Sequence, residues 1–143
     1  MSLYTDKHRL FAAYVKELNS FRPGNEQTEG EAREACDRYI SCADCTWKNI
    51  FAPDTNELVG FLIFGKSGKE KHPDTDRAIA EAYVTPEYRR QGLAKEICRY
   101  LIERAAEKGA EKIYLESSDV AVELYRSLGF EDMNGYMKLN TIK

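Results

Sequence analysis

The sequence has no apolar run of the length that crosses a membrane. Hydrophobic residues make up 43% of the 143 residues, but none of their runs approaches the about 20 residues that a transmembrane helix needs. The segment from Met1 to Phe21 interleaves charged and apolar side chains, unlike the uniform apolar segment of a signal peptide. We therefore expect a cytoplasmic protein that does not associate with membranes.

Neither sign of charge predominates. Lysine and arginine contribute 21 residues and aspartate and glutamate contribute 24, which gives a net charge of -3 at pH 7. Surfaces that bind nucleic acids owe their affinity to basic residues that neutralise phosphates. The charge balance therefore predicts no nucleic-acid partner, and it is compatible with a cationic small substrate.

Histidine and cysteine are scarce, with two and four residues respectively. Cys42 and Cys45 form a lone C-x-x-C, but a zinc site needs two more ligands, and Cys36 with a histidine shows no recognised spacing. A redox dithiol usually opens a helix, whereas this pair ends one. We expect reduced, buried thiols and no metal ion. The lack of a G-x-S-x-G segment also argues against a hydrolase triad.

Hydrophobic periodicity predicts interleaved helices and strands in one domain, residues 1–143. A domain of this length can bury roughly 70% of its unfolded surface, and the interleaving favours the α/β or α+β class. Thr28 and Glu31 form a capping box, and the charged stretch 66–76 is expected to be an exposed loop. A first helix is expected to begin at a cap, Thr5 or Asp6, and to end at Pro23, and further helices are expected at 28–43, 93–106 and 119–128. Strands are expected at 47–51, 58–64, 78–84, 113–116 and 136–139.

Residues 82–94 form a strand–loop–helix unit that is suited to a diphosphate. The first N–H groups of a helix are unpaired and lie at the positive end of its dipole, so they can hold phosphate oxygens. Gly92 lets an anion approach the backbone, and Ala94 keeps the next position small. Arg89 and Arg90 add guanidinium charge beside the loop. The unit is neither a dinucleotide G-x-G-x-x-G nor a phosphate loop.

Residues 89–94, Arg-Arg-Gln-Gly-Leu-Ala, resemble the [Q/R]-x-x-G-x-[G/A] motif of the GNAT N-acetyltransferase superfamily. A second block, residues 121–130, resembles the A-x-x-L-Y-x-x-x-G-F segment of the same family. The resemblance covers about residues 78–130. It implies a GNAT-like fold, with a mixed central sheet flanked by helices, and acetyl-coenzyme A as cosubstrate.

The resemblance also implies which residues bind the coenzyme. The main chain at Tyr83 and Val84 would bond the pantetheine arm, and the hydroxyl of Ser118 stands where the family often has asparagine. The pyrophosphate would lie against the loop and helix start formed by Arg89, Arg90, Gln91, Gly92, Leu93 and Ala94.

Two residues are candidates for proton transfer. By the resemblance, Tyr125 would donate a proton to the coenzyme thiolate, although a tyrosine in a short helix also suits a packed core. Strand alternation places Glu81 on the same face as Tyr83 and opposite Val84, so its carboxylate could accept the proton of an acceptor ammonium. A solvent-facing glutamate is the alternative.

The sequence thus predicts acetyl transfer to a primary amine, by direct attack in a ternary complex and without an acyl-enzyme. A small molecule is the favoured acceptor. Alternatives are a protein N-terminus or lysine, or a coenzyme A-binding regulatory module without catalysis, and a homodimer stays open. The acceptor is expected between the two N-terminal helices and the strand edges, where aromatic residues could line the site or belong to the core: Tyr14, Phe21, Tyr39 and Trp47.

Overall fold

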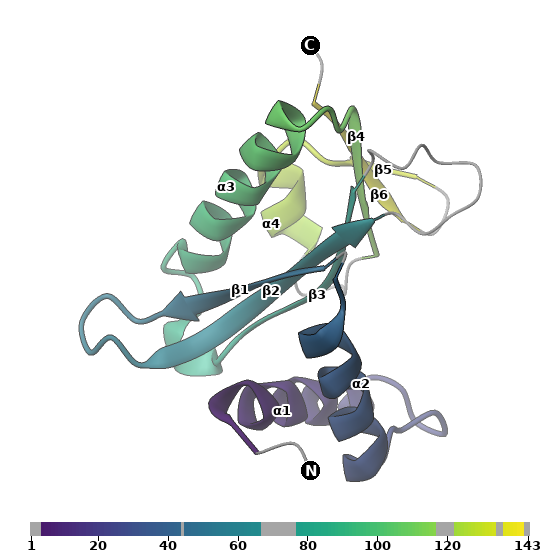
Figure 1. Cartoon of the computed structure of the whole chain (residues 1–143), viewed down its shortest axis with the longest axis vertical. Coiled ribbons are helices and arrows are strands. Elements are labelled where there is room, and N and C mark those ends of the chain that lie inside the picture. The colour runs from purple at the N-terminus through teal and green to yellow at the C-terminus, as the bar shows by residue number, and fades with distance from the viewer. Residues whose placement is uncertain (1–3, 44, 67–76, 117–121, 134–135, 142–143) are drawn as a thin grey trace.

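The computed structural model describes residues 4–43, 45–66, 77–116, 122–133 and 136–141. They form one mixed sheet with helices on both of its faces (Figure 1). In chain order the elements are α1 (Asp6–Ser20), α2 (Glu29–Ser41), β1 (Thr46–Phe51), β2 (Leu58–Lys66), β3 (Arg77–Val84), the 3-10 turn η1 (Pro86–Tyr88), α3 (Leu93–Glu107), β4 (Lys112–Leu115), α4 (Val122–Ser127), β5 (Glu131–Asp132) and β6 (Met137–Asn140).

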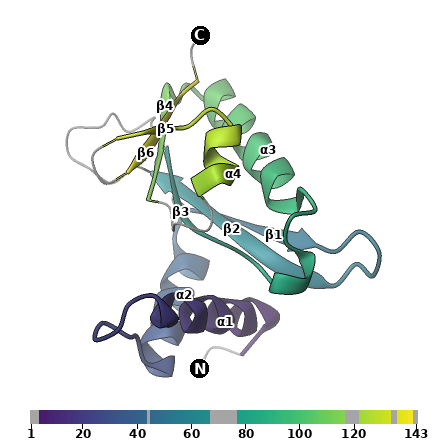
Figure 2. The ribbon, with the colours of Figure 1, turned by 180° about the vertical axis from the view of Figure 1, so that it is seen from behind.

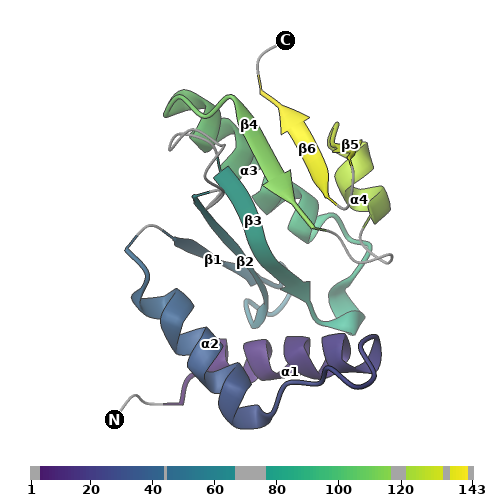
Figure 3. The same ribbon diagram turned by 90° about the vertical axis from the view of Figure 1, so that its right-hand side faces the viewer.

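The six strands are ordered β1-β2-β3-β4-β6-β5. Strands β1, β2 and β3 pair antiparallel, as do β4, β6 and β5. The two antiparallel groups meet where β3 and β4 run parallel, joined through α3 (Figure 3). The expected mixed sheet is confirmed.

Alternation along β2 divides the interior into two layers. Leu62 and Phe64 pack with α3, α4 and β4, whereas Phe61 and Ile63 pack with α1 and α2 on the other face. Figure 2 shows α3 and α4 over one part of the sheet, with α1 and α2 gathered beyond it. Gly60, at the start of this strand, has no side chain because a Cβ there would collide with the carbonyl oxygen of Tyr83.

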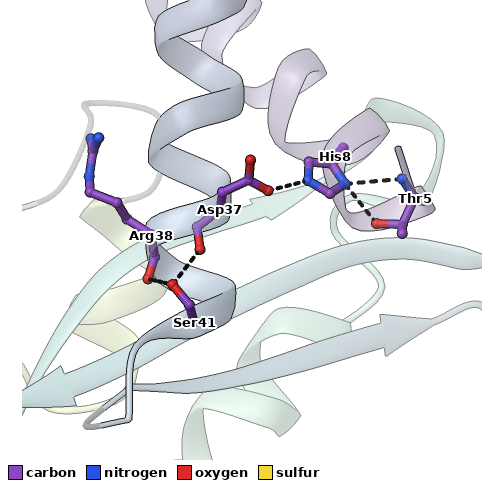
Figure 4. A network of polar contacts seen from close by, with 5 residues as sticks. All are labelled: Thr5, His8, Asp37, Arg38 and Ser41. Carbon is purple, nitrogen blue, oxygen red and sulfur yellow. Dashed lines mark hydrogen bonds and ion pairs between the residues drawn. The ribbon is translucent and has the colours of Figure 1, made fainter. Parts of the chain in front are cut away.

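The two N-terminal helices are fixed by polar contacts at their starts. The Thr28 hydroxyl accepts from the Glu31 N–H at 3.1 Å and the Glu31 carboxylate accepts from the Thr28 N–H at 3.0 Å, which confirms the predicted capping box. His8 is 4% exposed, and its Nε2 lies 2.6 Å from the Asp37 carboxylate of α2 (Figure 4). Because its Nδ1 accepts the Thr5 N–H, His8 joins the first turn of α1 to α2.

Most predicted elements lie within a few residues of their observed bounds. The last helix is shorter than predicted where it is described, since α4 begins at Val122, and residues 119–121 lie outside the described part. The same holds for residues 67–76 of the expected loop, while Lys66 ends β2. Strand β5 was not predicted, because its two charged, exposed residues carry no strand pattern.

Candidate active site

Strand β3 separates from β4 before it reaches its own end. The pairing with β4 covers Arg77–Ile79, and β3 continues to Val84 beside β2 alone. A register shift places one extra residue, Ala80, between the positions that face Phe64 and Ile63 of β2. The last part of β3 therefore offers main-chain groups on the β4 side without a partner strand among the described residues.

The start of α3 lies just beyond this strand end and carries unpaired N–H groups. Gly92 is the N-cap, with φ 80, a left-handed conformation that favours glycine, and no side chain caps the helix. The first intrahelical bond runs from Glu96 N–H to Gly92 carbonyl at 3.0 Å. Within the described residues, the N–H groups of Leu93, Ala94 and Lys95 have no hydrogen-bond partner, and no atom lies within 4 Å of the point where a Gly92 Cβ would stand.

The two arginines before this glycine take different positions. Arg89 donates from Nε to the Val84 carbonyl at 2.8 Å and pairs with Glu17 of α1 at 2.5 Å, with its guanidinium 5.5 Å from the Tyr83 ring centre. Arg90 is exposed and has a left-handed φ of 64. The guanidinium of Arg89 therefore joins β3 to α1, and Arg90 is the arginine of the motif that faces solvent.

Two further polar groups near the loop bear on coenzyme binding. Gln91 is exposed, and its amide donates to the Glu87 carbonyl at 3.4 Å. The Thr85 hydroxyl is buried and finds no hydrogen-bond partner within the described residues. A buried polar atom without a partner costs free energy, so this hydroxyl, the unpaired amides of α3 and the open Gly92 position together fit a bound pyrophosphate and its linker.

A cavity of about 380 Å³ opens on the other side of β3, between that strand and helices α1 and α2. Its volume falls in the range for metabolite-sized ligands. The N-terminal helices and β3 thus enclose a space in the region where the acceptor is expected, and the binding of an acceptor there stays a prediction. The side chains that line it include Phe11, Tyr14, Leu18, Ala35, Tyr39 and Glu81.

Glu81 contributes the carboxylate of this cavity. Burial raises the pKa of Glu81 to about 7, and the hydrogen bond from the Tyr14 hydroxyl and the charge of Arg22 oppose that rise in part. The prediction that Glu81 shares a face with Tyr83 is confirmed, because both contact the α1 side while Val84 packs toward α3. The alternative of a solvated glutamate is wrong: the carboxylate is mostly buried.

Two tyrosines, Tyr14 and Tyr39, line the cavity beside Glu81. Burial and the Glu81 charge raise the pKa of Tyr39 to about 12, and raise that of Tyr14 further. Tyr125 of α4 has a smaller electrostatic effect on Tyr14, and it packs in the core on the other face of the sheet. Of the other aromatic candidates, Trp47 packs against the core formed by α1 and α2, and Phe21 is 60% exposed; neither lines the cavity.

Tyr125 is buried, and its ring packs edge-on against Phe130 at 5.7 Å. Burial, with a smaller effect of Cys98, raises the pKa of Tyr125, so its hydroxyl keeps its proton at neutral pH. This packing agrees with the core interpretation of the residue, and its role as an acid stays a prediction. Ser118 lies outside the described residues.

The cysteines fall into two pairs. Cys36 and Cys98 are buried, and burial raises the pKa of their thiols to about 11 and about 12. Cys42 and Cys45 are only half-buried and line the cavity, which corrects the expectation that all four thiols are buried. No group of three or more metal-ligating side chains occurs among the described residues. No helix in the described part of the chain is long and apolar enough to span a membrane.

Sequence reasoning missed the exposed cavity-lining residues Arg22, Gln27 and Arg38. They come from the segment after α1 and from α2, and their positions depend on how these two helices pack. An exposed arginine has no local pattern that marks it as part of a cavity.

Residues 11–130 match the Acetyltransferase (GNAT) family. Among curated proteins, the chain is 38% identical over 52 residues to the [ribosomal protein bS18]-alanine N-acetyltransferase of Escherichia coli (strain K12), covering 34% of this chain and 35% of that protein. It is 36% identical over 62 residues to the glucosamine 6-phosphate N-acetyltransferase of Trypanosoma brucei brucei, covering 43% and 42%. The chain thus aligns with less than half the length of either relative.

Solved structures resemble the chain over nearly its whole length. A GCN5-related N-acetyltransferase from Kribbella flavida gives a TM-score of 0.73 at 15% identity, covering 98% of this chain and 95% of that one. The PaiA N-acetyltransferase from Thermoplasma acidophilum, in complex with coenzyme A, gives 0.67 at 17% identity, covering 93% and 89%. The fold that the motif resemblance implied is therefore confirmed.

Proposed function

The chain belongs to the Acetyltransferase (GNAT) family, and from this premise we propose that it transfers an acetyl group from acetyl-coenzyme A to the primary amine of a small molecule. The observation that carries the proposal is Glu81, a buried carboxylate that faces the cavity with a pKa of about 7. It lies on β3, three residues before the strand end that leads to the free amides of α3. One strand thus connects the two halves of the proposed site.

The coenzyme half is supported by groups that have no other partner. The amides of Leu93, Ala94 and Lys95 and the exposed Arg90 would hold the pyrophosphate, and the main chain at Tyr83 and Val84 would bond the pantetheine arm. The Thermoplasma acidophilum relative in complex with coenzyme A supports this placement by its fold. The coenzyme supplies the acetyl thioester.

Glu81 is proposed as the base. An amine attacks only without its extra proton, so a group near the acceptor must accept that proton. A base works best when its pKa lies near the working pH, and burial brings the pKa of Glu81 to about 7. The Tyr14 hydroxyl, which donates to this carboxylate, orients it within the cavity.

Tyr125 is proposed as the acid that protonates the departing thiolate. Its hydroxyl remains protonated at neutral pH because burial raises its pKa. The proposal is supported by the motif block that carries Tyr125 and by the protonated hydroxyl. The nitrogen of the acceptor ammonium loses two protons as its C–N bond forms and the C–S bond of the thioester breaks. The first goes to Glu81 and from there to solvent, and the second replaces the proton that Tyr125 gives to the thiolate, so the chain returns to its starting state after one turnover. Attack within a ternary complex needs no covalent intermediate on the chain.

A small-molecule acceptor is favoured by the size of the cavity and by the acceptor named for the glucosamine 6-phosphate relative. The relative that acetylates an alanine of ribosomal protein bS18 favours a protein N-terminus as the second candidate. The two candidates differ in the acceptor and share the same base and acid. A panel that contains both free amines and short peptides with alanine at the N-terminus separates them.

The test combines calorimetry with acetyl-coenzyme A and an assay of free thiol over the amine panel. The chain should bind acetyl-coenzyme A and release thiol only with an amine, and kcat/KM should rise with pH with a half-maximum near the pKa of Glu81, about 7. Glu81→Gln should lower kcat at least about 100-fold and leave coenzyme affinity unchanged, while Glu103→Gln on exposed α3 should change neither. Coenzyme binding without thiol release from any amine or peptide would instead favour the non-catalytic module.

A further inference from the structure

Charged groups in the acceptor cavity are separated by sign. Its only carboxylate among the described lining residues is Glu81, on β3. Its two arginines, Arg22 and Arg38, are exposed and therefore lie at the mouth. A ligand that enters the cavity must pass two positive charges before it reaches the buried carboxylate.

The two guanidinium groups have no carboxylate of their own. Within the described part of the chain, neither side chain forms an ion pair or donates a hydrogen bond. Figure 4 shows the Arg38 side chain extending away from the pair that the preceding residue, Asp37, forms with His8. Unpaired arginines suit planar, bidentate contacts with carboxylate or phosphate oxygens.

Both charges act on groups inside the cavity. Arg22 opposes the rise in the pKa of Glu81, and Arg38 opposes that of Tyr39. The segment that carries Arg22 is held in place because the Asn19 amide donates to the Gln27 carbonyl at 3.0 Å and accepts its N–H at 2.9 Å. The two hydrogen bonds thus hold the ends of the segment that carries Arg22, and both arginines line the cavity.

We propose that the acceptor carries an anionic group, a carboxylate or a phosphate, beside the amine that is acetylated, and that Arg22 and Arg38 bind this group at the mouth. The inference rests on the proposed function and adds the substrate class. An acceptor with only positive charges would be repelled by both guanidinium groups. An acceptor with both charges places its amine toward Glu81 and its anion toward the arginines.

This assignment departs from what the whole chain suggests. The net charge of -3 is compatible with a cationic substrate, but the described side chains that line the cavity include two arginines and one glutamate. Interactions between charges weaken over about 8–10 Å at physiological salt. The local charges therefore decide the acceptor.

The experiment uses amines matched in carbon skeleton. Acetylation of 5-aminopentanoate is compared with that of pentylamine and cadaverine, and acetylation of phosphoethanolamine with that of ethanolamine. The wild-type chain should prefer the anionic member of each set in kcat/KM by about 10- to 100-fold, the range for a charge-assisted hydrogen bond. The double variant Arg22→Gln, Arg38→Gln should lose this preference, which is measured as the ratio of kcat/KM between the anionic and the uncharged-tail amine of each set. The ratio is used because removing Arg22 also alters the pKa of Glu81, and that change affects all the amines alike. Arg33→Gln, on α2 and over the Tyr4 ring, is the matched control and should retain the preference.

The outcomes separate this inference from the proposed function. Three outcomes would overturn the inference and leave the proposed acetyl transfer intact. The chain could acetylate pentylamine and 5-aminopentanoate equally well, it could prefer cadaverine, or its preference for the anionic amine could survive in the double variant. If none of the amines is acetylated although acetyl-coenzyme A binds, the proposed function fails. Calorimetry with 5-aminopentanoate then tests the anion site alone: weaker binding to the double variant than to the wild-type chain supports the site, and equal binding or no binding overturns it.

Discussion

Replacing Glu81 by glutamine is expected to stabilise the folded chain at alkaline pH, although it removes the proposed base. Burial raises the pKa of Glu81 from 4.5 to about 7. Because the folded state holds this proton more tightly than the unfolded chain, ionisation lowers the free energy of unfolding as pH rises from about 4.5 to about 7, and the loss is complete above that value. The linkage relation with these two values gives a loss of about 1 kcal/mol at pH 5 and about 3 kcal/mol at pH 8.

Glutamine has nearly the same shape, carries no charge and still accepts the Tyr14 hydrogen bond, so the variant escapes this loss. Urea unfolding of both proteins at pH 5 and pH 8 measures the difference, because other titrating groups cancel between them. The stabilisation by Glu81→Gln should be about 2–3 kcal/mol larger at pH 8 than at pH 5. Glu103→Gln should show the same small change at both pH values because water solvates that side chain when the chain is folded. If the stabilisation by Glu81→Gln does not grow with pH, the conclusion that burial raises the pKa of Glu81 is wrong.

Tyr14→Phe removes the hydrogen bond that favours the charged form of Glu81, so the pKa of Glu81 should rise further. The rising limb of the pH profile of kcat/KM should then move to higher pH, and a limb that does not move would show that Tyr14 does not act on the proposed base. Gly92→Val should lower the free energy of unfolding by about 1–2 kcal/mol, because Gly92 has a left-handed φ that valine adopts only at a cost; urea unfolding measures this. The same variant should weaken acetyl-coenzyme A binding at least about tenfold in calorimetry, and an unchanged affinity would contradict the proposed anion-binding loop. N-ethylmaleimide should modify Cys42 and Cys45 in the folded chain and spare Cys36 and Cys98, as peptide mass analysis would show; early labelling of the buried pair would be inconsistent with their raised pKa values.

The parts of the site that follow from short-range patterns were predictable from sequence. The strand, loop and helix start at 82–94 are adjacent along the chain, so glycine position and helix periodicity define them. The shared face of Glu81 and Tyr83 was also predictable, because the extra residue in β3, Ala80, lies before Glu81 and leaves the alternation intact up to Val84. The motif blocks then indicated the family.

Contacts between segments far apart in the chain were not predictable. The Arg89–Glu17 pair joins residues 72 apart, and the His8–Asp37 pair joins residues 29 apart. Such pairs arise only when packing of the apolar faces brings α1 against β3 and α2, and the individual residues are ordinary surface types. The pairing of Arg89 shows the consequence: the sequence places it beside phosphates, whereas the structure places its guanidinium on α1.

Helix α1 joins the two halves of the site through residues one turn apart. Tyr14 donates to Glu81 in the proposed acceptor cavity, and Glu17 pairs with Arg89 in the proposed coenzyme loop. Positions i and i+3 lie on one face of a helix, so both contacts are made by the face that packs on β3. A displacement of α1 would therefore remove the Tyr14 hydrogen bond from Glu81, the proposed base, and break the Arg89–Glu17 pair at the same time. Because aligned reactants account for a large part of the rate in a direct transfer, the packing of this helix sets the geometry on which the proposed reaction depends.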